Sequence, residues 1–241
     1  MENLDIKLPI FLDLSAGTDA LNDLEKIETA CIRSGVLLTF KCKGDKEIEY
    51  IKSRYYDTKT DGDIISVRTL FYKIPSPVYI ETERLTVSDI AEKDKDDYFR
   101  LYTDIDLNKW WGYDYNDDLN GDKPTPDWFY NFQKSLKDKK EEYSLAVRVD
   151  GKMVGELVLH NFDFYGGIEM GFRFFRECHG KGYATESALA LKEFVRKVVC
   201  AKRIKSRCFK ENIPSKNLIT RLGLKPCRED KTHYYFGQDL K

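Results

Sequence analysis

The stretch from Gly171 to Glu186 constrains the fold of this chain more than any other feature of its sequence. The alternating run from Ile168 to Phe174 predicts a strand, and Gly180 and Gly182 predict a sharp bend after it. The residues from about Tyr183 to Lys197 then predict a helix. Such a bend turns several backbone N–H groups toward one point, where the helix N-terminus adds a partial positive charge. The segment therefore predicts a loop that binds a pyrophosphate.

Two small residues support this interpretation, because side chains larger than those of Gly182 and Ala184 would keep a phosphate away from the backbone. The alternative is an ordinary strand-to-helix turn in which glycine relieves strain and nothing binds. The segment fits neither common nucleotide motif. It lacks the third glycine of the Rossmann motif, and it lacks the Gly-Lys-Ser/Thr of the Walker loop.

The sequence Ile74-Pro75-Ser76-Pro77 divides the chain, because two prolines can continue neither a helix nor a central strand. We expect a small α/β module of unknown role in residues 1–75 and a larger domain in residues 78–241. The elements predicted before the linker are a strand from Pro9 to Leu14, a helix capped by Asp19 and ended by Gly35 with Leu21, Leu24, Ile27 and Cys31 on one face, a strand from Val36 to Cys42 and a strand from Asp63 to Lys73.

The larger domain has a regular pattern of strands and helices. The predicted elements are a strand from Tyr79 to Val87, a helix from Lys93 to Thr103, a loop from Trp110 to Pro126, a helix from Trp128 to Leu136, a hairpin of Tyr143–Val149 and Met153–Asn161 around Asp150-Gly151, the strand and helix of the phosphate loop, a strand from Ile204 to Phe209, a helix from Pro214 to Leu222 and a strand from Thr232 to Asp239.

With these residues in view, the phosphate loop resembles the acetyl-CoA loop of the GNAT acetyltransferases, Gln/Arg-x-x-Gly-x-Gly/Ala. His179, Gly182 and Ala184 occupy its first, fourth and sixth places, and His179 departs from the usual Gln or Arg. The segment from Gly180 to Glu186 is similar to the Rim-type branch, which includes ribosomal-protein N-terminal acetyltransferases. Three further segments resemble the family in the expected order: Thr82-Glu83-Arg84-Leu85, the hairpin segment Asp150 to Gly155, and Glu211 to Ser215 followed by Arg221 to Leu224.

The resemblance runs from about residue 79 to about residue 240. It implies an α/β (mixed α+β) fold, with a GNAT-like twisted mixed sheet flanked by helices and two strands splayed apart beside the cofactor. It also implies acetyl-CoA as the cosubstrate. The implied pyrophosphate-binding residues are His179, Gly180, Lys181, Gly182, Tyr183, Ala184 and Thr185.

The same resemblance assigns four more residues to coenzyme A. Phe172 and Phe174 lie on the strand whose peptide groups bind the pantetheine arm in the family, although their side chains are also what a core strand would contain. Asn212 and Ser215 occupy positions that contact coenzyme A, although Asn-x-Pro-Ser is also a good helix-capping sequence without any ligand.

The chemistry implied is attack of an amine on a thioester, which requires a deprotonated amine and donors for the oxyanion. Glu169 lies where many members of the superfamily carry the base, and the alternative is a solvent-facing glutamate on an alternating strand. Ile219 takes the place of the usual tyrosine acid, so no acid is assigned. We reject a Cys178–His179 nucleophile, because adjacent side chains rarely face each other and direct transfer needs no nucleophile.

The segment Trp110-Trp111-Gly112-Tyr113 precedes an acidic loop that begins at Asp114. Aromatic faces beside carboxylates would suit a cationic acceptor, so Trp110, Trp111, Tyr113 and Asp114 are candidate acceptor-binding residues. The alternative is a solvated loop with one buried tryptophan.

The composition narrows the class of protein. Forty basic residues nearly balance forty-one acidic ones, which argues against a nucleic-acid partner. The six cysteines form no C-x-x-C pair, so we expect no metal, and the apolar runs are too short to span a bilayer. We expect a soluble cytoplasmic protein with no membrane partner, and assembly as a homodimer stays open.

These observations predict an acetyltransferase that moves an acetyl group from acetyl-CoA to a primary amine. The acceptor is a protein N-terminus or a small polycationic amine. The alternative function is a non-catalytic acyl-CoA sensor, with the N-terminal module as the element that binds a partner. A sensor would bind acetyl-CoA without releasing coenzyme A.

Overall fold

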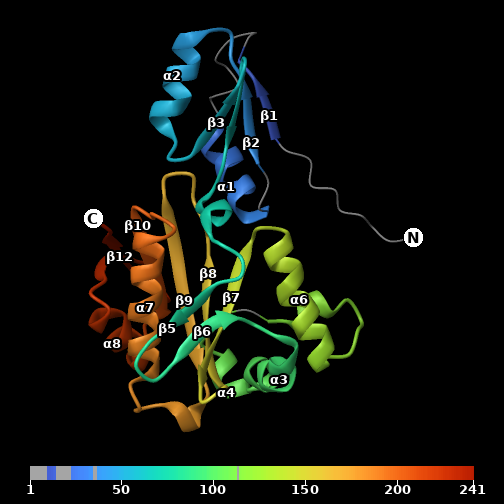
Figure 1. Cartoon of the computed structure of the whole chain (residues 1–241), viewed down its shortest axis with the longest axis vertical. Coiled ribbons are helices and arrows are strands. Elements are labelled where there is room, and N and C mark those ends of the chain that lie inside the picture. Colours follow the sequence, from blue (N-terminus) through green and yellow to red (C-terminus); the bar gives the residue numbers. More distant parts are fainter. Residues whose placement is uncertain (1–9, 15–22, 35–36, 113) are drawn as a thin grey trace.

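The computed structural model of the chain describes residues 10–14, 23–34, 37–112 and 114–241. The described strands form two sheets, one from residues 10–67 and a larger one from residues 79–239 (Figure 1). The elements are β1 (Ile10–Asp13), α1 (Leu24–Ser34), β2 (Leu38–Lys41), α2 (Asp45–Arg54), β3 (Thr58–Asp61), β4 (Ile64–Val67), β5 (Tyr79–Glu81), β6 (Thr86–Asp89), α3 (Lys95–Thr103), α4 (Ile105–Asn108), α5 (Asn116–Leu119), α6 (Pro126–Asp138), β7 (Glu142–Val149), β8 (Lys152–His160), β9 (Gly167–Phe174), α7 (Tyr183–Lys197), β10 (Arg203–Phe209), α8 (Ile213–Arg221), β11 (Lys225–Glu229) and β12 (His233–Asp239), with short 3₁₀ turns at Leu70–Lys73, Glu92–Asp94 and Arg176–Cys178.

The N-terminal sheet has the order β1-β2-β4-β3, with β1 and β2 parallel and the other pairs antiparallel. Helices α1 and α2 bury Cys31 and Ile51 against the strand residues of the same core. The prediction of one strand from Asp63 to Lys73 is wrong beyond Val67, because Leu70 and Phe71 turn away and are buried in the core of the larger sheet. Helix α2 and strand β3 were not predicted from the sequence. The predicted helix ends, Asp19 and Gly35, lie outside the described residues.

The larger sheet has the order β11-β12-β10-β9-β8-β7-β6-β5. The predicted strand from Tyr79 to Val87 is two strands, because Thr82 closes a tight turn by accepting from and donating to Leu85. The predicted loop from Trp110 to Pro126 contains the short helix α5. All neighbouring strands are antiparallel except β9 and β10, which α7 joins as a crossover.

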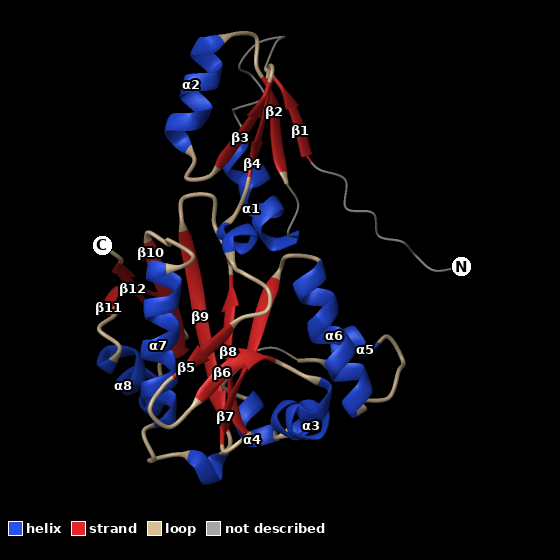
Figure 2. Cartoon of the chain, in the orientation of Figure 1, coloured by secondary structure: helices blue, strands red, loops and turns tan. Residues whose placement is uncertain are grey.

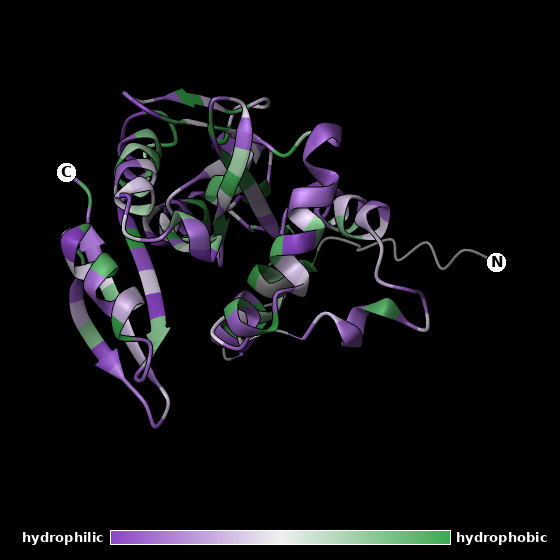
Figure 3. Ribbon diagram, turned by 90° about the horizontal axis from the view of Figure 1, so that it is seen from below, coloured by the Kyte–Doolittle hydropathy of each residue, from purple (hydrophilic) through white to green (hydrophobic). Residues whose placement is uncertain are grey.

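The two faces of this sheet are covered by different helices (Figure 2). Alternate residues of β7 separate them: Leu145 packs in the core that contains Leu191 of α7, whereas Ala146 packs in the core that contains Leu101 of α3 and Phe129 of α6. Hydrophobic residues recur along the strands between these helices (Figure 3). Among the helices in the described ranges, none combines the length and apolar character needed to cross a bilayer.

Strands β9 and β10 separate after three paired residues. Residues 203–205 of β10 pair with Gly167, Ile168 and Glu169 of β9, and beyond Glu169 the two strands are no longer paired. The Ser206 hydroxyl still donates to the Met170 carbonyl at 2.9 Å. The remaining edge of β9 therefore turns its backbone groups toward the gap, as expected for splayed strands beside a cofactor.

Candidate active site

A cavity of about 1220 Å³ lies at the gap between β9 and β10. It is lined by residues from both faces of the sheet: Gly171 and Arg173 face the α3 and α6 side, and Phe172 and Phe174 face the α7 side. The cavity therefore crosses the sheet through the gap. This geometry lets a ligand from one side reach a second ligand on the other.

One end of the cavity is formed by the phosphate loop. Gly180 and Gly182 have φ angles of +74° and +83°, which L side chains rarely adopt, and Gly182 is the N-cap of α7. Of the predicted loop residues, His179, Gly180, Gly182, Tyr183, Ala184 and Thr185 line the cavity. Lys181 lies outside the described lining.

Three residues outside the loop hold it in place. The Glu186 carboxylate accepts from the Thr82 hydroxyl at 2.7 Å and from Arg84 Nε at 2.8 Å, and Arg84 Nη1 donates to the Lys181 carbonyl. Although burial raises it, these hydrogen bonds hold the pKa of Glu186 below its ordinary value. The imidazole Nε2 of His179 lies 3.0 Å from the Phe174 carbonyl, so this departure from the family pattern joins the loop to the end of β9.

The other predicted cofactor residues also line the cavity. Phe174 is buried in the core and Phe172 packs against it, so both side chains have a structural role as well. Asn212 caps α8 by accepting from the Ser215 N–H at 3.1 Å, and both residues border the cavity. Ile219 is fully buried in the core, so the position of the usual tyrosine carries no acid.

The segment of Trp110, Trp111 and Gly112 connects the two separated strands. The Trp110 ring packs on Phe209 of β10 with centroids 6.1 Å apart, and a Cβ on Gly171 of β9 would lie 2.9 Å from the Trp111 ring. Both tryptophans line the cavity, as does Asp118. Tyr113 lies outside the described residues. Asp114 accepts hydrogen bonds from the backbone and side chain of Asn116, so it stabilises the local turn.

On the α3 and α6 face, the cavity is lined by a row of titratable side chains on adjacent strands. Glu142 of β7 pairs with His160 of β8, and His160 pairs with Glu169 of β9. Paired residues of neighbouring strands project from the same face. Glu169 lies 3.2 Å from Arg207 Nε, accepts from Asn161 at 3.0 Å, and has an oxygen 3.8 Å from His160 Nε2.

Burial shifts the pKa values of two members of this row, Glu142 and His160. Burial, and then the nearby Glu156 carboxylate, raise the pKa of Glu142 to about 7. Burial lowers the pKa of His160 below its ordinary value, against the opposing effect of Glu169. Burial therefore favours the neutral form of the His160 imidazole.

A buried ion pair lies on the same face of the sheet as this row. Glu156 is inaccessible to solvent, and the Arg173 guanidinium bonds it from the paired position on β9. The same guanidinium bonds Asn108 and stacks between the rings of Tyr102, at 3.8 Å, and Trp111, at 4.5 Å. Arg173 therefore fixes the ring that covers Gly171.

The site also contains four residues that were not predicted from the sequence: Glu142, His160, Glu156 and Arg173. Alternation along β9 places Arg173 on the same face as Glu169, which is a signal that could have identified it. Glu142 and His160 gave no comparable signal, because their pairing depends on an irregularity in the hairpin.

Replacing Glu142 by glutamine is expected to remove a pH dependence of stability. A carboxyl whose pKa rises from 4.5 to about 7 on folding contributes stability below pH 4.5 that is lost as pH rises through 7. At about 1.4 kcal/mol per pKa unit, the contribution of Glu142 to the free energy of unfolding falls by as much as about 3 kcal/mol in the wild type. Urea unfolding between pH 4.5 and 8 should show this slope in the wild type and a smaller one in Glu142→Gln. The exposed Glu81→Gln should keep it, and equal slopes in all three proteins would contradict the assignment.

The comparisons with known proteins agree with this geometry. A family model described as "Acetyltransferase (GNAT) domain" matches residues 84–225, more than half of the 241 residues. This chain belongs to the GNAT acetyltransferase family, and it is an acetyl-CoA-dependent acyltransferase.

The individual relatives share only a low sequence identity with this chain. The chain is 26% identical over 133 residues to the "Uncharacterized N-acetyltransferase YnaD" of Bacillus subtilis (strain 168), covering 52% of this chain and 78% of that protein. Mycobacterium smegmatis RimJ in complex with CoA-disulfide has a TM-score of 0.57 at 15% identity, covering 68% of this chain and 88% of RimJ. Vibrio cholerae spermidine N-acetyltransferase in complex with CoA and spermine has a TM-score of 0.56 at 13% identity, covering 66% of this chain and 97% of that protein. These two structures support the fold alone.

Proposed function

We propose that this enzyme acetylates a primary amine of a protein N-terminus or of a small polycationic molecule, and that it belongs to the Rim-type branch. The observation that carries this proposal is the cavity that crosses the sheet, with the phosphate loop at one end and the Glu142–His160–Glu169 row at the other. Acetyl-CoA enters from the loop side, and the acceptor enters from the α3 and α6 face.

In the proposed cofactor site, backbone N–H groups of the loop and the N-terminus of α7 bind the pyrophosphate. The edge of β9 from Gly171 to Phe174 binds the pantetheine arm through its peptide groups. The gap between β9 and β10 then exposes the thioester to the opposite face. Asn212 and Ser215 contact coenzyme A from the start of α8.

In the proposed reaction, the amine nitrogen attacks the thioester carbonyl, the C–S bond breaks, and coenzyme A leaves as a thiolate that takes up a proton. An ammonium has no lone pair, so the acceptor must first lose a proton. Glu169 is the proposed base, acting through water, and the His160 imidazole lies beside it, with Nε2 3.8 Å from a Glu169 oxygen. The Arg207 and Asn161 contacts fix the position of the Glu169 carboxylate.

Two features favour a cationic acceptor. Carboxylates of Asp118, Glu142 and Glu169 line the cavity, and so do the side chains of Trp110 and Trp111. Carboxylates and aromatic faces both attract ammonium groups. The fold similarity to the spermine complex and to RimJ is consistent with either acceptor type.

Release of free thiol across a panel of monoamines, polyamines and basic peptides tests this proposal. We expect turnover to be highest with acceptors that carry more than one positive charge. Thiol release only with monocationic amines would contradict the polycationic preference.

Glu169→Gln is expected to lower kcat at pH 7 by about 100-fold and to shift the pH–rate profile toward alkaline pH, because the amine must then lose its proton without the base. The affinity for acetyl-CoA should stay unchanged. Glu177→Gln, an exposed glutamate next to the loop, is the matched control and should behave like the wild type. An unaltered profile in Glu169→Gln, together with a shifted profile in His160→Gln, would assign the base to His160 instead.

A further inference from the structure

The N-terminal module contacts the loop that connects β8 to β9. Phe164 of this loop is buried among Cys31, Phe40 and Tyr55 in the core of the module. The backbone N–H of Tyr56 donates to the Phe164 carbonyl at 2.9 Å, and the Tyr56 hydroxyl bonds the Cys200 carbonyl. The module is therefore packed onto the segment that leads directly into β9.

A buried carboxylate holds α1 at this contact. Glu28 of α1, only 4% exposed, accepts from Tyr55 Oη at 2.6 Å and from Tyr165 Oη at 2.8 Å. Arg54 Nε donates to it at 3.1 Å. One side chain of α1 thus bonds residues of both the module and the β8–β9 loop.

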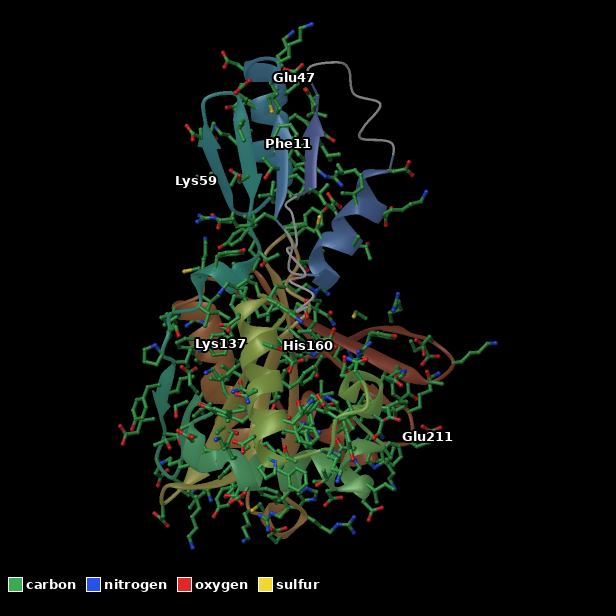
Figure 4. All side chains as sticks on the ribbon, turned by 90° about the vertical axis from the view of Figure 1, so that its right-hand side faces the viewer. Phe11, Glu47, Lys59, Lys137, His160 and Glu211 are labelled. Carbon is green, nitrogen blue, oxygen red and sulfur yellow. The ribbon has the colours of Figure 1, made fainter. Side chains whose placement is uncertain are left out.

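The same face of α1 reaches the cavity. Ile32 follows Glu28 by one helical turn, so it projects from the same side of the helix. Ile32 lines the cavity together with Leu136, Glu142 and His160, and it also packs on the core of the module. Figure 4 shows His160 at the end of the larger sheet that lies nearest to α1.

We propose that the N-terminal module is part of the acceptor site, with Ile32 forming the wall that the far end of an elongated amine contacts. This inference rests on the proposed function. The apolar surface of Ile32 and Leu136 suits a methylene chain, while the ionised form of Glu142 attracts a cationic group along it. The module therefore selects acceptors by length, whereas the residues around β9 and β10 serve every acceptor.

The test compares variants at two isoleucines of α1 that both pack on the module core. Ile32 lines the cavity, whereas Ile27 is not among the described residues that line it. Ile27→Ala is therefore the matched control for Ile32→Ala. Ile32→Trp fills the end of the cavity. Each variant is assayed with 1,3-diaminopropane, spermidine, spermine and a basic tripeptide, both as substrates and by calorimetry in the presence of coenzyme A.

We expect Ile32→Trp to raise the KM and Kd for spermine at least 10-fold, to leave those for 1,3-diaminopropane within twofold, and to leave the KM for acetyl-CoA unchanged. Ile32→Ala should change the order of preference among the longer amines, whereas Ile27→Ala should lower only the melting temperature. A length profile that is the same in the wild type and both Ile32 variants would overturn the inference, as would an equal change in Ile27→Ala. If the wild type binds the amines without acetylating them, the proposed function fails while the calorimetric comparison still decides the role of Ile32. If it binds none of them, both fail.

Discussion

Replacing Gly182 by leucine is expected to weaken acetyl-CoA binding by at least about 100-fold, or about 2.8 kcal/mol. Gly182 has a φ of +83°, and a Cβ there would lie 3.2 Å from Arg84 Nη2, so the side chain disturbs the contacts that hold the loop. A leucine would also occupy the space that a pyrophosphate needs next to the N-terminus of α7. Isothermal calorimetry with acetyl-CoA measures the loss.

The control is Gly151→Leu in the turn between β7 and β8. Gly151 has a φ of +78°, and a Cβ there would meet nothing within 4 Å, so the substitution causes a similar backbone strain of about 1–2 kcal/mol away from the cavity. Both variants should lose similar stability, and only Gly182→Leu should lose the cofactor. A folded Gly182→Leu protein with wild-type affinity would show that the cofactor binds elsewhere.

Arg173→Met is expected to destabilise the protein by about 3–5 kcal/mol, because it leaves the Glu156 carboxylate buried without its partner. Burial then favours the protonated form and raises the pKa of Glu156 further. A carboxyl with a raised folded-state pKa contributes stability at low pH that is lost as pH rises. Urea unfolding should therefore show a larger defect at pH 8 than at pH 5.

The double variant Arg173→Met with Glu156→Leu is the matched test of this cause. It removes both charges at similar volume, which typically restores most of the stability. The acceptor KM should be raised both in Arg173→Met and in the double variant, because Trp111 has lost the guanidinium that it stacks on in each of them. If Arg173→Met alone unfolds with wild-type free energy at pH 8, the ion pair is not a determinant of stability.

Local residue patterns predicted most of the larger domain. The helix from Tyr183 to Lys197 was predicted with its observed bounds, and the strand of the phosphate loop to within one residue. Asp150 and Gly151 both have positive φ in the hairpin turn, as their residue types indicate. These features depend on glycine geometry and on alternation, which are properties of short segments.

Smaller elements before the linker were predicted less well. Leu70 and Phe71 follow Val67 after Arg68 and Thr69, and the chain turns after Val67 so that both are buried against the larger sheet. Helix α2 has an apolar face of few residues around the buried Ile51, which gives a weak periodic signal. In both cases, packing against a distant segment decided the conformation.

The sequence by itself determined the strand, bend and helix from Ile168 to Lys197 and the hairpin turn at Asp150-Gly151, because each depends on residues that are neighbours in the chain. Only the tertiary structure decided which side chains meet in the site. A two-residue turn at Asp150-Gly151 would pair Glu142 with Leu159, but a bulge shifts the register so that Met153 pairs with Arg148 and Gly155 with Val147. Glu142 consequently pairs with His160. The contact of Ile32 with the cavity likewise depends on Phe164 entering the module core, a long-range packing event that no local pattern encodes.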